Sequence, residues 1–324
     1  MSAPGVEPVP GVEHAPAAVP ALPALQLDHV SRWYGNVIAV NDISFALGPG
    51  VTGLLGPNGA GKSTLLHLMA GLLAPSAGRV LVHGGSAWRR PAMYRHVGLV
   101  PEREAVHPYL TGRQFARLNA QLQGIADPDD AADRAIATVD LAAAADRAIG
   151  TYSKGMRQRA KLAGALVHDP TVLLLDEPFN GMDPRQRLHM MTLLRSMAAD
   201  GKTILFSSHI LEEVERLADS ILVVYAGRLA AAGDFRSIRR LMTDRPHTFT
   251  VRSSDDRRLA AALMADASVF GTELADGRIA VRTADYAAFT RTLPQVARAN
   301  GVSLFEVAPT DDSLESVFSY LVRR

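Results

Sequence analysis

One short glycine-rich segment constrains this chain more than any other part of its sequence. Residues 56–64 read GPNGAGKST and fill every position of the phosphate-binding pattern G-x-x-x-x-G-K-[ST]. An apolar segment, 51–55, precedes the pattern, and a second one, 65–70, follows it. This order predicts a strand, a loop and a helix, in which backbone N–H groups and the helix N-terminus surround an anion. The segment therefore predicts that the chain binds a nucleoside triphosphate.

Individual residues of this loop have separate expected roles in holding a nucleotide. Lys62 can reach the β- and γ-phosphates, and the hydroxyl oxygen of Ser63 can be a ligand of Mg²⁺. A glycine-rich turn with a chance lysine is the competing interpretation, and a match at every position makes it the weaker one. The neighbouring positions complete the expected binding set: Asn58, Gly59, Ala60, Gly61 and Thr64.

Another apolar segment, far downstream of the phosphate loop, ends in two acidic residues. Residues 172–175 read VLLL and are followed by Asp176 and Glu177. A buried parallel strand delivers such side chains to the ligand crevice at its carboxyl end. We expect Asp176 to hold Mg²⁺ and Glu177 to orient and deprotonate the attacking water. An ordinary pair of strand-ending acids is the alternative, which the phosphate loop upstream makes less attractive.

Composition excludes several other classes of protein. The net charge is +1, which gives no global attraction to nucleic acid, and no nucleic-acid partner is expected. The chain contains no cysteine, so disulfides and thiolate metal sites are excluded. Its apolar runs are strand-sized, far below the about 20 residues that a membrane-spanning helix needs. A role at a membrane would therefore require a partner.

Changes in periodicity divide the chain into regions. The Pro- and Ala-rich residues 1–24 predict a disordered tail. Residues 25–240 alternate strands with helices, as in an α/β layer structure, and include a helical subdomain at about 103–165. Residues 245–324 show the order strand, helix, two strands, helix and strand, with a last helix at 313–322. This order predicts a small α+β, ferredoxin-like domain.

The segment between the loop and the two acids resembles a known family. Residues 152–159 read YSKGMRQR. Ser153 and Gly155 occupy the serine and second glycine of the Leu-Ser-Gly-Gly-Gln signature of the ATP-binding cassette (ABC) family, and a Gln-Arg pair follows as it does there. The resemblance covers residues 25–235. Taken by itself, the segment 152–159 indicates only a helix that begins with basic residues. The resemblance implies a P-loop domain of ABC type that hydrolyses ATP with Mg²⁺.

Three further positions gain an expected role from this resemblance. Tyr34 is similar to the family's adenine-stacking aromatic residue, with Trp33 as the alternative and strand packing as the simpler explanation. Asp183 falls in the family's D-loop and would touch the opposite subunit, although an aspartate before Pro184 is also a good N-cap. His209 matches the switch histidine that contacts the γ-phosphate. With Lys62 and Glu177 it completes the expected catalytic set.

Two positions depart from the family pattern. Glu102 stands where the family usually has glutamine, and we expect it to sense the γ-phosphate through Mg²⁺. Lys154 replaces the first glycine of the signature, and it either adds a positive charge near the partner's nucleotide or points to solvent. Both departures, and the chain end at 311–318, resemble the antibiotic- and lipid-type exporter branch of the family.

Family geometry places the phosphate loop and the signature on opposite edges of one subunit. The resemblance therefore implies a homodimer, or a pair with a similar ATPase subunit, in which each copy contributes Ser153 and Gly155 to the other's ATP. The implied function is the ATP-hydrolysing subunit of an exporter, cytoplasmic and peripheral on the inner face of the cell membrane. A separate integral membrane permease would hold it there, with residues 103–117 as the contact surface. A soluble ABC ATPase acting on ribosomes or DNA is the alternative.

Overall fold

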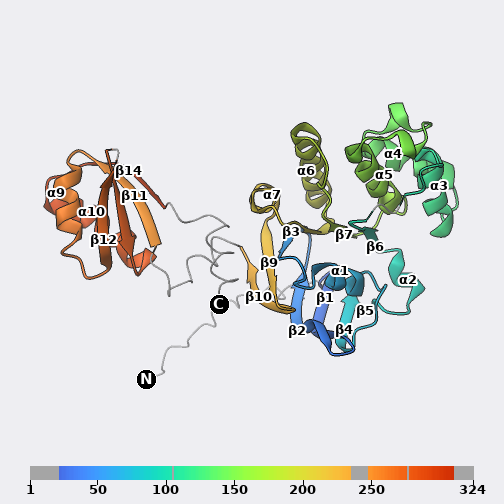
Figure 1. Ribbon diagram of the computed structural model, residues 1–324, viewed down its shortest axis with the longest axis horizontal. Coiled ribbons are helices and arrows are strands. Elements are labelled where there is room, and N and C mark those ends of the chain that lie inside the picture. The colour runs from blue at the N-terminus through green and yellow to red at the C-terminus, as the bar shows by residue number, and fades with distance from the viewer. Residues whose placement is uncertain (1–21, 104–105, 235–246, 276, 310–324) are drawn as a thin grey trace, which may run out of the picture.

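The structure is a computed structural model that describes residues 22–103, 106–234, 247–275 and 277–309 (Figure 1). Most of the expected N-terminal tail and the helix expected at 313–322 lie outside the described residues. Within the described residues, no helix combines the length and the apolar character that crossing a bilayer requires.

An antiparallel sheet is built from the first strands of the chain. Its strand order is β2-β1-β4-β5. A tight turn joins the first two strands, so that Tyr34 pairs with Val37 across it. The bounds are β1 (Leu25–Tyr34), β2 (Val37–Leu47), β4 (Ala77–Val82) and β5 (Gly85–Ser86).

A six-stranded sheet forms the centre of the nucleotide-binding region. Its order is β10-β9-β3-β8-β7-β6, with five parallel strands and an antiparallel β10 at one edge. Its central strands are buried along their length, which explains their continuous apolar runs. The bounds are β3 (Gly50–Leu55), β6 (Val97–Val100), β7 (Val172–Asp176), β8 (Thr203–Ser207), β9 (Ser220–Tyr225) and β10 (Arg228–Gly233).

Helices connect these strands, and three of them form a separate layer. Figure 1 shows α3, α4 and α5 packed on one another. Thr111 and Gln114 form a capping box at the start of α3, and Ser153 caps α5. The bounds are α1 (Lys62–Met69), α2 (Pro91–Tyr94), α3 (Gly112–Leu122), α4 (Pro128–Thr138), α5 (Lys154–Leu166), α6 (Pro184–Ala199) and α7 (Leu211–Leu217), with 3-10 turns at Ala142–Ala144 and Ile149–Thr151.

The two faces of the six-stranded sheet contribute to different cores. On one face, Leu174 and Leu205 pack with α1 and the antiparallel sheet. On the other face, Leu173 and Phe206 pack with residues of α5 and α6. Neighbouring residues of one strand alternate between the faces, so a single strand serves both cores. Because both faces are covered, the strand ends are held in fixed positions.

The C-terminal strands form a third sheet with its own core. Its order is β12-β13-β11-β14, and every pairing is antiparallel. Two helices and the buried Phe249 and Phe289 complete this ferredoxin-like arrangement. The predicted fold class, an α/β P-loop fold with a helical layer and a small α+β unit, is confirmed. The bounds are β11 (His247–Ser253), α9 (Asp256–Leu263), β12 (Val269–Ala275), β13 (Arg278–Thr283), α10 (Tyr286–Ala299) and β14 (Leu304–Pro309).

Candidate functional site

The phosphate loop runs from the end of β3 to the start of α1, and close packing fixes its backbone. A β-carbon on Gly56 would lie 2.3 Å from the carbonyl oxygen of Val224, and one on Gly61 would lie 2.2 Å from that of Ala39. Gly61 also has a φ of 104°, which L side chains rarely adopt. Glycine is therefore required at both ends of the loop.

The side chain of Lys62 lies along its own loop. Its Nζ donates hydrogen bonds to the carbonyl oxygens of Gly56 at 2.7 Å and Pro57 at 3.3 Å. Burial lowers the pKa of the Lys62 ammonium, and the negative charges of Glu177, Asp176 and Glu102 act in the opposite direction. The Lys62 ammonium is thus surrounded by carboxylate and peptide oxygens. It can also bind a phosphate group, because phosphate oxygens accept hydrogen bonds in the same way and carry more negative charge.

The loop and the acids line one open cavity of about 320 Å³. This cavity brings together segments that are distant in sequence, as expected for the carboxyl ends of parallel strands. Ala60, a residue of the loop itself, is buried and does not line the cavity. The expected residues that do line it are Asn58, Gly59, Gly61, Lys62, Ser63, Thr64, Glu102, Asp176 and Glu177.

The two acids at the end of β7 are held by a serine from the neighbouring strand. Asp176 is 4% exposed, and its Oδ1 accepts a hydrogen bond of 2.6 Å from Ser207 Oγ. The same Ser207 oxygen accepts the N–H of Glu177 at 2.9 Å. Sequence reasoning missed Ser207. A hydroxyl that ends the apolar segment 203–206 was the available signal, but the strand pairing that gives it a role was not visible.

Glu177 turns back toward the cavity through an unusual backbone conformation. Its φ is 49°, in the left-handed region that costs a residue with a side chain about 1 kcal/mol. Burial raises the pKa of the Glu177 carboxyl, while the hydrogen bond and charge of His209 oppose that rise. A raised pKa makes this carboxylate a better proton acceptor near neutral pH.

His209 reaches the site through Glu177. Its Nδ1 lies 2.9 Å from Glu177 Oε2, while the imidazole ring is more than half exposed. The residue follows β8 and does not line the cavity. The structure therefore places His209 as a partner of the expected catalytic carboxylate.

The signature residues lie outside the cavity of their own chain. Ser153 Oγ accepts the N–H of Met156 at 3.2 Å as the N-cap of α5. A β-carbon on Gly155 would lie 1.8 Å from Gln186 Oε1, so the Gln186 side chain covers this glycine. Asp183 is the N-cap of α6, accepting the N–H of Gln186 at 2.9 Å. None of the three predicted residues lines the nucleotide cavity.

The structure gives Lys154 a contact that neither of its two expected roles included. A β-carbon on Gly181 would lie 2.8 Å from Lys154 Cδ, so the aliphatic stem of the lysine packs on this glycine. Gln158 Nε2 lies 3.4 Å from the carbonyl oxygen of Asn180 in the same loop. The signature segment and the segment 180–183 therefore contact each other within one chain.

The apolar part of the cavity comes from a place that sequence reasoning missed. Val37 and Ile38 of β2 line it and are 64% and 53% exposed. Tyr34 is 43% exposed, does not line the cavity, and has the Arg32 guanidinium 4.7 Å from its ring centroid. No motif in the sequence indicated that the start of β2 lies beside the phosphate loop.

The donor set fits Mg²⁺ held jointly with a nucleotide. Among the described residues, no three His, Asp or Glu side chains are grouped so that they could hold a metal ion alone. A hydroxyl of Ser63 and the carboxylates of Asp176 and Glu102 nevertheless line the same cavity. Mg²⁺ is commonly bound by one or two protein oxygen ligands together with phosphate oxygens and water.

Comparison with known proteins agrees with this geometry. A family model described as ABC transporter matches residues 40–180. A linearmycin resistance ATP-binding protein from Bacillus subtilis is 31% identical over 93% of this chain and 98% of its own length. A Nod factor export ATP-binding protein I from Paraburkholderia xenovorans is 39% identical over 65% of this chain and 70% of its own length.

Solved structures show the same fold. The ATP-binding subunit of an ABC transporter has a TM-score of 0.61 at 29% identity, covering 67% of this chain and 92% of that one. A dimeric bacterial ABC transporter cassette has a TM-score of 0.61 at 22% identity, covering 65% and 98%. The names of the relatives favour export over the alternative of an ATPase acting on ribosomes or DNA. The chain belongs to the ABC transporter family, as an ATP-binding and ATP-hydrolysing subunit of the exporter-type branch.

Proposed function

We propose that this subunit hydrolyses MgATP in a site completed by a second subunit, and that it transmits the resulting motion to a separate membrane permease. One observation carries the proposal. Lys62, Asp176 and Glu177 line one cavity, whereas Ser153 and Gly155 of the same chain do not reach it. The residues of the ABC signature therefore need a second copy to act on ATP.

The chemistry follows from the positions of the side chains in the cavity. Lys62 and the N-terminus of α1 hold the phosphates, while Asn58 and Thr64 complete their surroundings. The oxygens of Ser63, Asp176 and Glu102 would hold Mg²⁺, which would neutralise negative charge on the phosphates.

Proton transfer is the task of the two residues beyond the phosphates. Glu177 accepts a proton from the water whose oxygen attacks the γ-phosphorus, while the bond from that phosphorus to the β–γ bridging oxygen breaks and ADP is the leaving group. His209 holds the Glu177 carboxylate through the 2.9 Å contact, and it is placed to respond to the γ-phosphate. Ser207 fixes both acids at the end of β7.

The second subunit is a copy of this chain or a similar ATPase. Two-fold symmetry would place each signature opposite the phosphate loop of the partner, as in an isologous dimer. Ser153, Gly155 and Asp183 would then contact the nucleotide or the opposite subunit. One of the solved neighbours is described as a dimeric cassette, which supports this arrangement.

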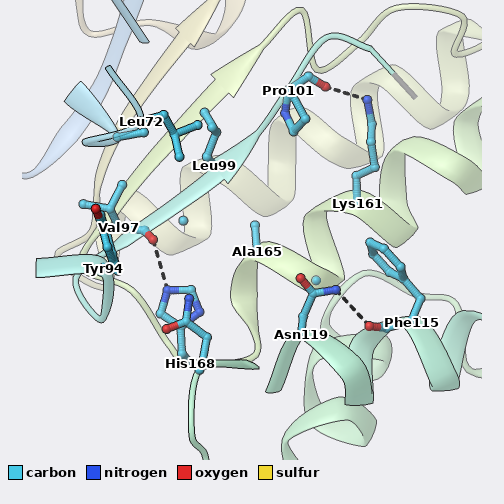
Figure 2. A pocket seen from close by; sticks show the side chains of 14 residues that line it. Leu72, Tyr94, Val97, Leu99, Pro101, Phe115, Asn119, Lys161, Ala165 and His168 are labelled. Carbon is cyan, nitrogen blue, oxygen red and sulfur yellow. Dashed lines mark hydrogen bonds between the residues drawn. The ribbon is translucent and has the colours of Figure 1, made fainter. Parts of the chain in front are cut away.

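A second cavity is our candidate for the permease contact. It has a volume of about 300 Å³ and lies between β6, α3 and α5 (Figure 2). Leu72, Tyr94, Leu99 and Phe115 give it an apolar lining. Of the contact surface expected at 103–117, this lining includes Phe115. It also includes Asn119 of α3 and Gln123, which directly follows that helix. A permease segment bound here would place the subunit on the inner face of the cell membrane.

We also propose limits for the two units of the chain. Residues 25–240 form the ATP-binding domain, with the helical subdomain at about 103–165, and residues 245–324 form the C-terminal domain. The separate cores of the described parts support this division.

Mixing two inactive variants tests the shared site. Lys62→Ala removes the phosphate-loop cation, and Ser153→Arg blocks the signature surface. A mixed dimer would contain one site with an intact Lys62 and an intact Ser153. Random pairing makes about half of the dimers mixed, so the mixture should recover up to about a quarter of the wild-type ATPase rate. Each variant alone, at the same total concentration, should be nearly inactive.

The mixing result separates the shared site from a site within one chain. If each chain completed its own site, mixing would give no more than the average of the two separate rates. Mixing either variant with an inactive Lys62→Ala/Ser153→Arg double variant is the control, because no pair in that mixture contains a complete site. Recovery in that control would also contradict the proposal.

A further inference from the structure

Lys161 of α5 is buried, and its ammonium group is bound to the segment that carries Glu102. The residue is 5% exposed. Its Nζ donates hydrogen bonds to three consecutive carbonyl oxygens, those of Pro101 at 2.7 Å, Glu102 at 3.2 Å and Arg103 at 3.3 Å. Figure 2 shows the first of these bonds, which joins α5 to the chain just after β6.

A charged group at this position needs a specific reason. Ala160, Leu162 and Ala163 beside it in α5 are buried apolar residues, as expected for a helix that packs on a core. Burial of an ammonium group is strongly unfavourable unless hydrogen bonds replace its hydration. An ammonium has three donors, and here three carbonyl oxygens lie within reach of them. These hydrogen bonds attach the Lys161 ammonium group to the backbone of residues 101–103.

The held backbone leads directly into the nucleotide cavity. Glu102 lines that cavity together with Asp176, and its charge acts on Lys62. Because the carbonyl of Glu102 is bonded to α5, the position of its carboxylate depends on the position of that helix. The same helix begins after Ser153, which we expect to act on the nucleotide of the second subunit. Lys161 thus connects groups assigned to two different nucleotides.

We propose that Lys161 is a positioning residue for ATP hydrolysis. Its ammonium group holds the backbone of residues 101–103 so that the Glu102 carboxylate faces the positions of Mg²⁺ and the γ-phosphate. This role rests on the one proposed above for Glu102, and it adds a group that does not line the nucleotide cavity. Lys161 and Pro101 also line the 300 Å³ cavity assigned to the permease, so a segment bound there would contact this connection.

Steady-state ATPase kinetics of the full chain test this role. Lys161→Met keeps the length of the side chain and removes its donors. We expect kcat to fall about tenfold, because a small displacement of a group at the reacting centre has effects of that order. The Mg²⁺ concentration at half-maximal rate should rise severalfold, while the affinity for ADP without Mg²⁺ stays within about twofold. Lys161→Arg, which keeps the charge and donors, should recover part of the rate.

Lys202 provides a matched control for the loss of a carbonyl-binding lysine. Its Nζ donates to the Pro170 carbonyl at 2.8 Å and to Asp169 Oδ1 at 2.5 Å, away from the residues that line the nucleotide cavity. Lys202→Met should lower Tm without changing kcat or the Mg²⁺ requirement. If Lys161→Met does the same, Lys161 only stabilises the fold and the proposal is overturned. Lys161→Gln replaces Lys161→Met in every comparison if the latter does not fold.

A double-variant cycle separates this role from that of Glu102. If Lys161 acts through Glu102, Lys161→Met should cause little further loss in a Glu102→Ala background. If Glu102→Ala alone leaves the rate and the Mg²⁺ requirement unchanged, the function proposed for Glu102 fails. If Glu102→Ala impairs hydrolysis and Lys161→Met still multiplies that loss in full, Lys161 acts elsewhere and the positioning role fails.

Discussion

The two regions expected to contact ATP are held in place in different ways. In the nucleotide cavity, Ser207 joins Asp176 and Glu177 through hydrogen bonds between residues about 30 positions apart. In the signature region, Ser153 and Asp183 make cap hydrogen bonds to N–H groups three residues away. The hydrogen bonds that hold the two catalytic acids are thus long-range, whereas those of Ser153 and Asp183 are local. This difference suits a site in which one side performs chemistry and the other is brought to it.

Of the substitutions that test this difference, removal of the Ser207 hydroxyl should reduce kcat the most, because this hydroxyl holds both acids of the nucleotide cavity. Ser207→Ala leaves the buried Asp176 carboxylate without the donor at 2.6 Å and the Glu177 N–H without its acceptor. We expect kcat to fall about 10- to 100-fold through misplacement of both acids. The free energy of unfolding should fall by about 1–3 kcal/mol. ATPase assays and chemical denaturation measure the two effects.

Thr203 at the other end of β8 supplies the control for this substitution. It is buried, and its hydroxyl has no hydrogen-bond partner among the described residues. Thr203→Val should therefore preserve kcat and keep or increase stability. A Ser207→Ala variant with kcat as high as that of Thr203→Val would contradict the prearranged site.

The contact between His209 and Glu177 should affect how kcat depends on pH. Glu177 must be ionised to accept a proton, so the rate falls as the pH falls through its pKa. Burial raises that pKa, and His209 opposes the rise. His209→Ala removes the opposing effect, so the pKa should rise further and the acid limb of the kcat–pH profile should move to higher pH.

An exposed histidine of α6 controls for the loss of imidazole. His189→Ala should leave the profile in place, because His189 does not contact the site. Both profiles are measured at saturating ATP and Mg²⁺. An acid limb that stays fixed or moves to lower pH in His209→Ala would show that the imidazole does not stabilise the Glu177 carboxylate.

Substitutions of Asp183 should have the smallest effect and test the locally restrained side. Asp183→Ala removes the cap of α6 and should lower the free energy of unfolding by about 1 kcal/mol. Asp183→Asn keeps a capping oxygen and should stay within a few tenths of a kcal/mol of wild type.

The Asn variant isolates the expected contact with the opposite subunit. We expect it to lower the ATPase rate about two- to fivefold by removing a charge at that contact, with no loss of stability. A rate equal to wild type in Asp183→Asn would leave Asp183 with the capping role alone.

Much of the site could be predicted because its functional residues are contiguous in sequence. The phosphate loop occupies residues 56–64, and the two acids end one apolar strand. A short motif of this kind carries its own local geometry, so the sequence indicates both the residues and their roles. The order of strands and helices likewise predicted the small C-terminal sandwich.

The missed residues act through contacts that only the folded chain creates. Ser207 and Lys161 acquire their roles from strand pairing and helix packing across about 30 and 60 positions. Val37 and Ile38 reach the cavity because β2 lies beside the loop, where Gly61 approaches the carbonyl of Ala39. A single sequence contains no signal for such long-range neighbours, so these residues read as ordinary strand and helix positions.

The hydrogen bonds from Lys62 to its own loop give this cation a second set of partners besides phosphate. A phosphate that binds must compete with these two peptide oxygens for the Lys62 ammonium group. When the phosphate leaves, the same oxygens accept hydrogen bonds from the ammonium, so no unpaired charge remains in a partly buried place. The hydrogen bonds within the loop therefore lower its affinity for the nucleotide. A lowered affinity suits a subunit that has to release ADP once in every cycle of hydrolysis.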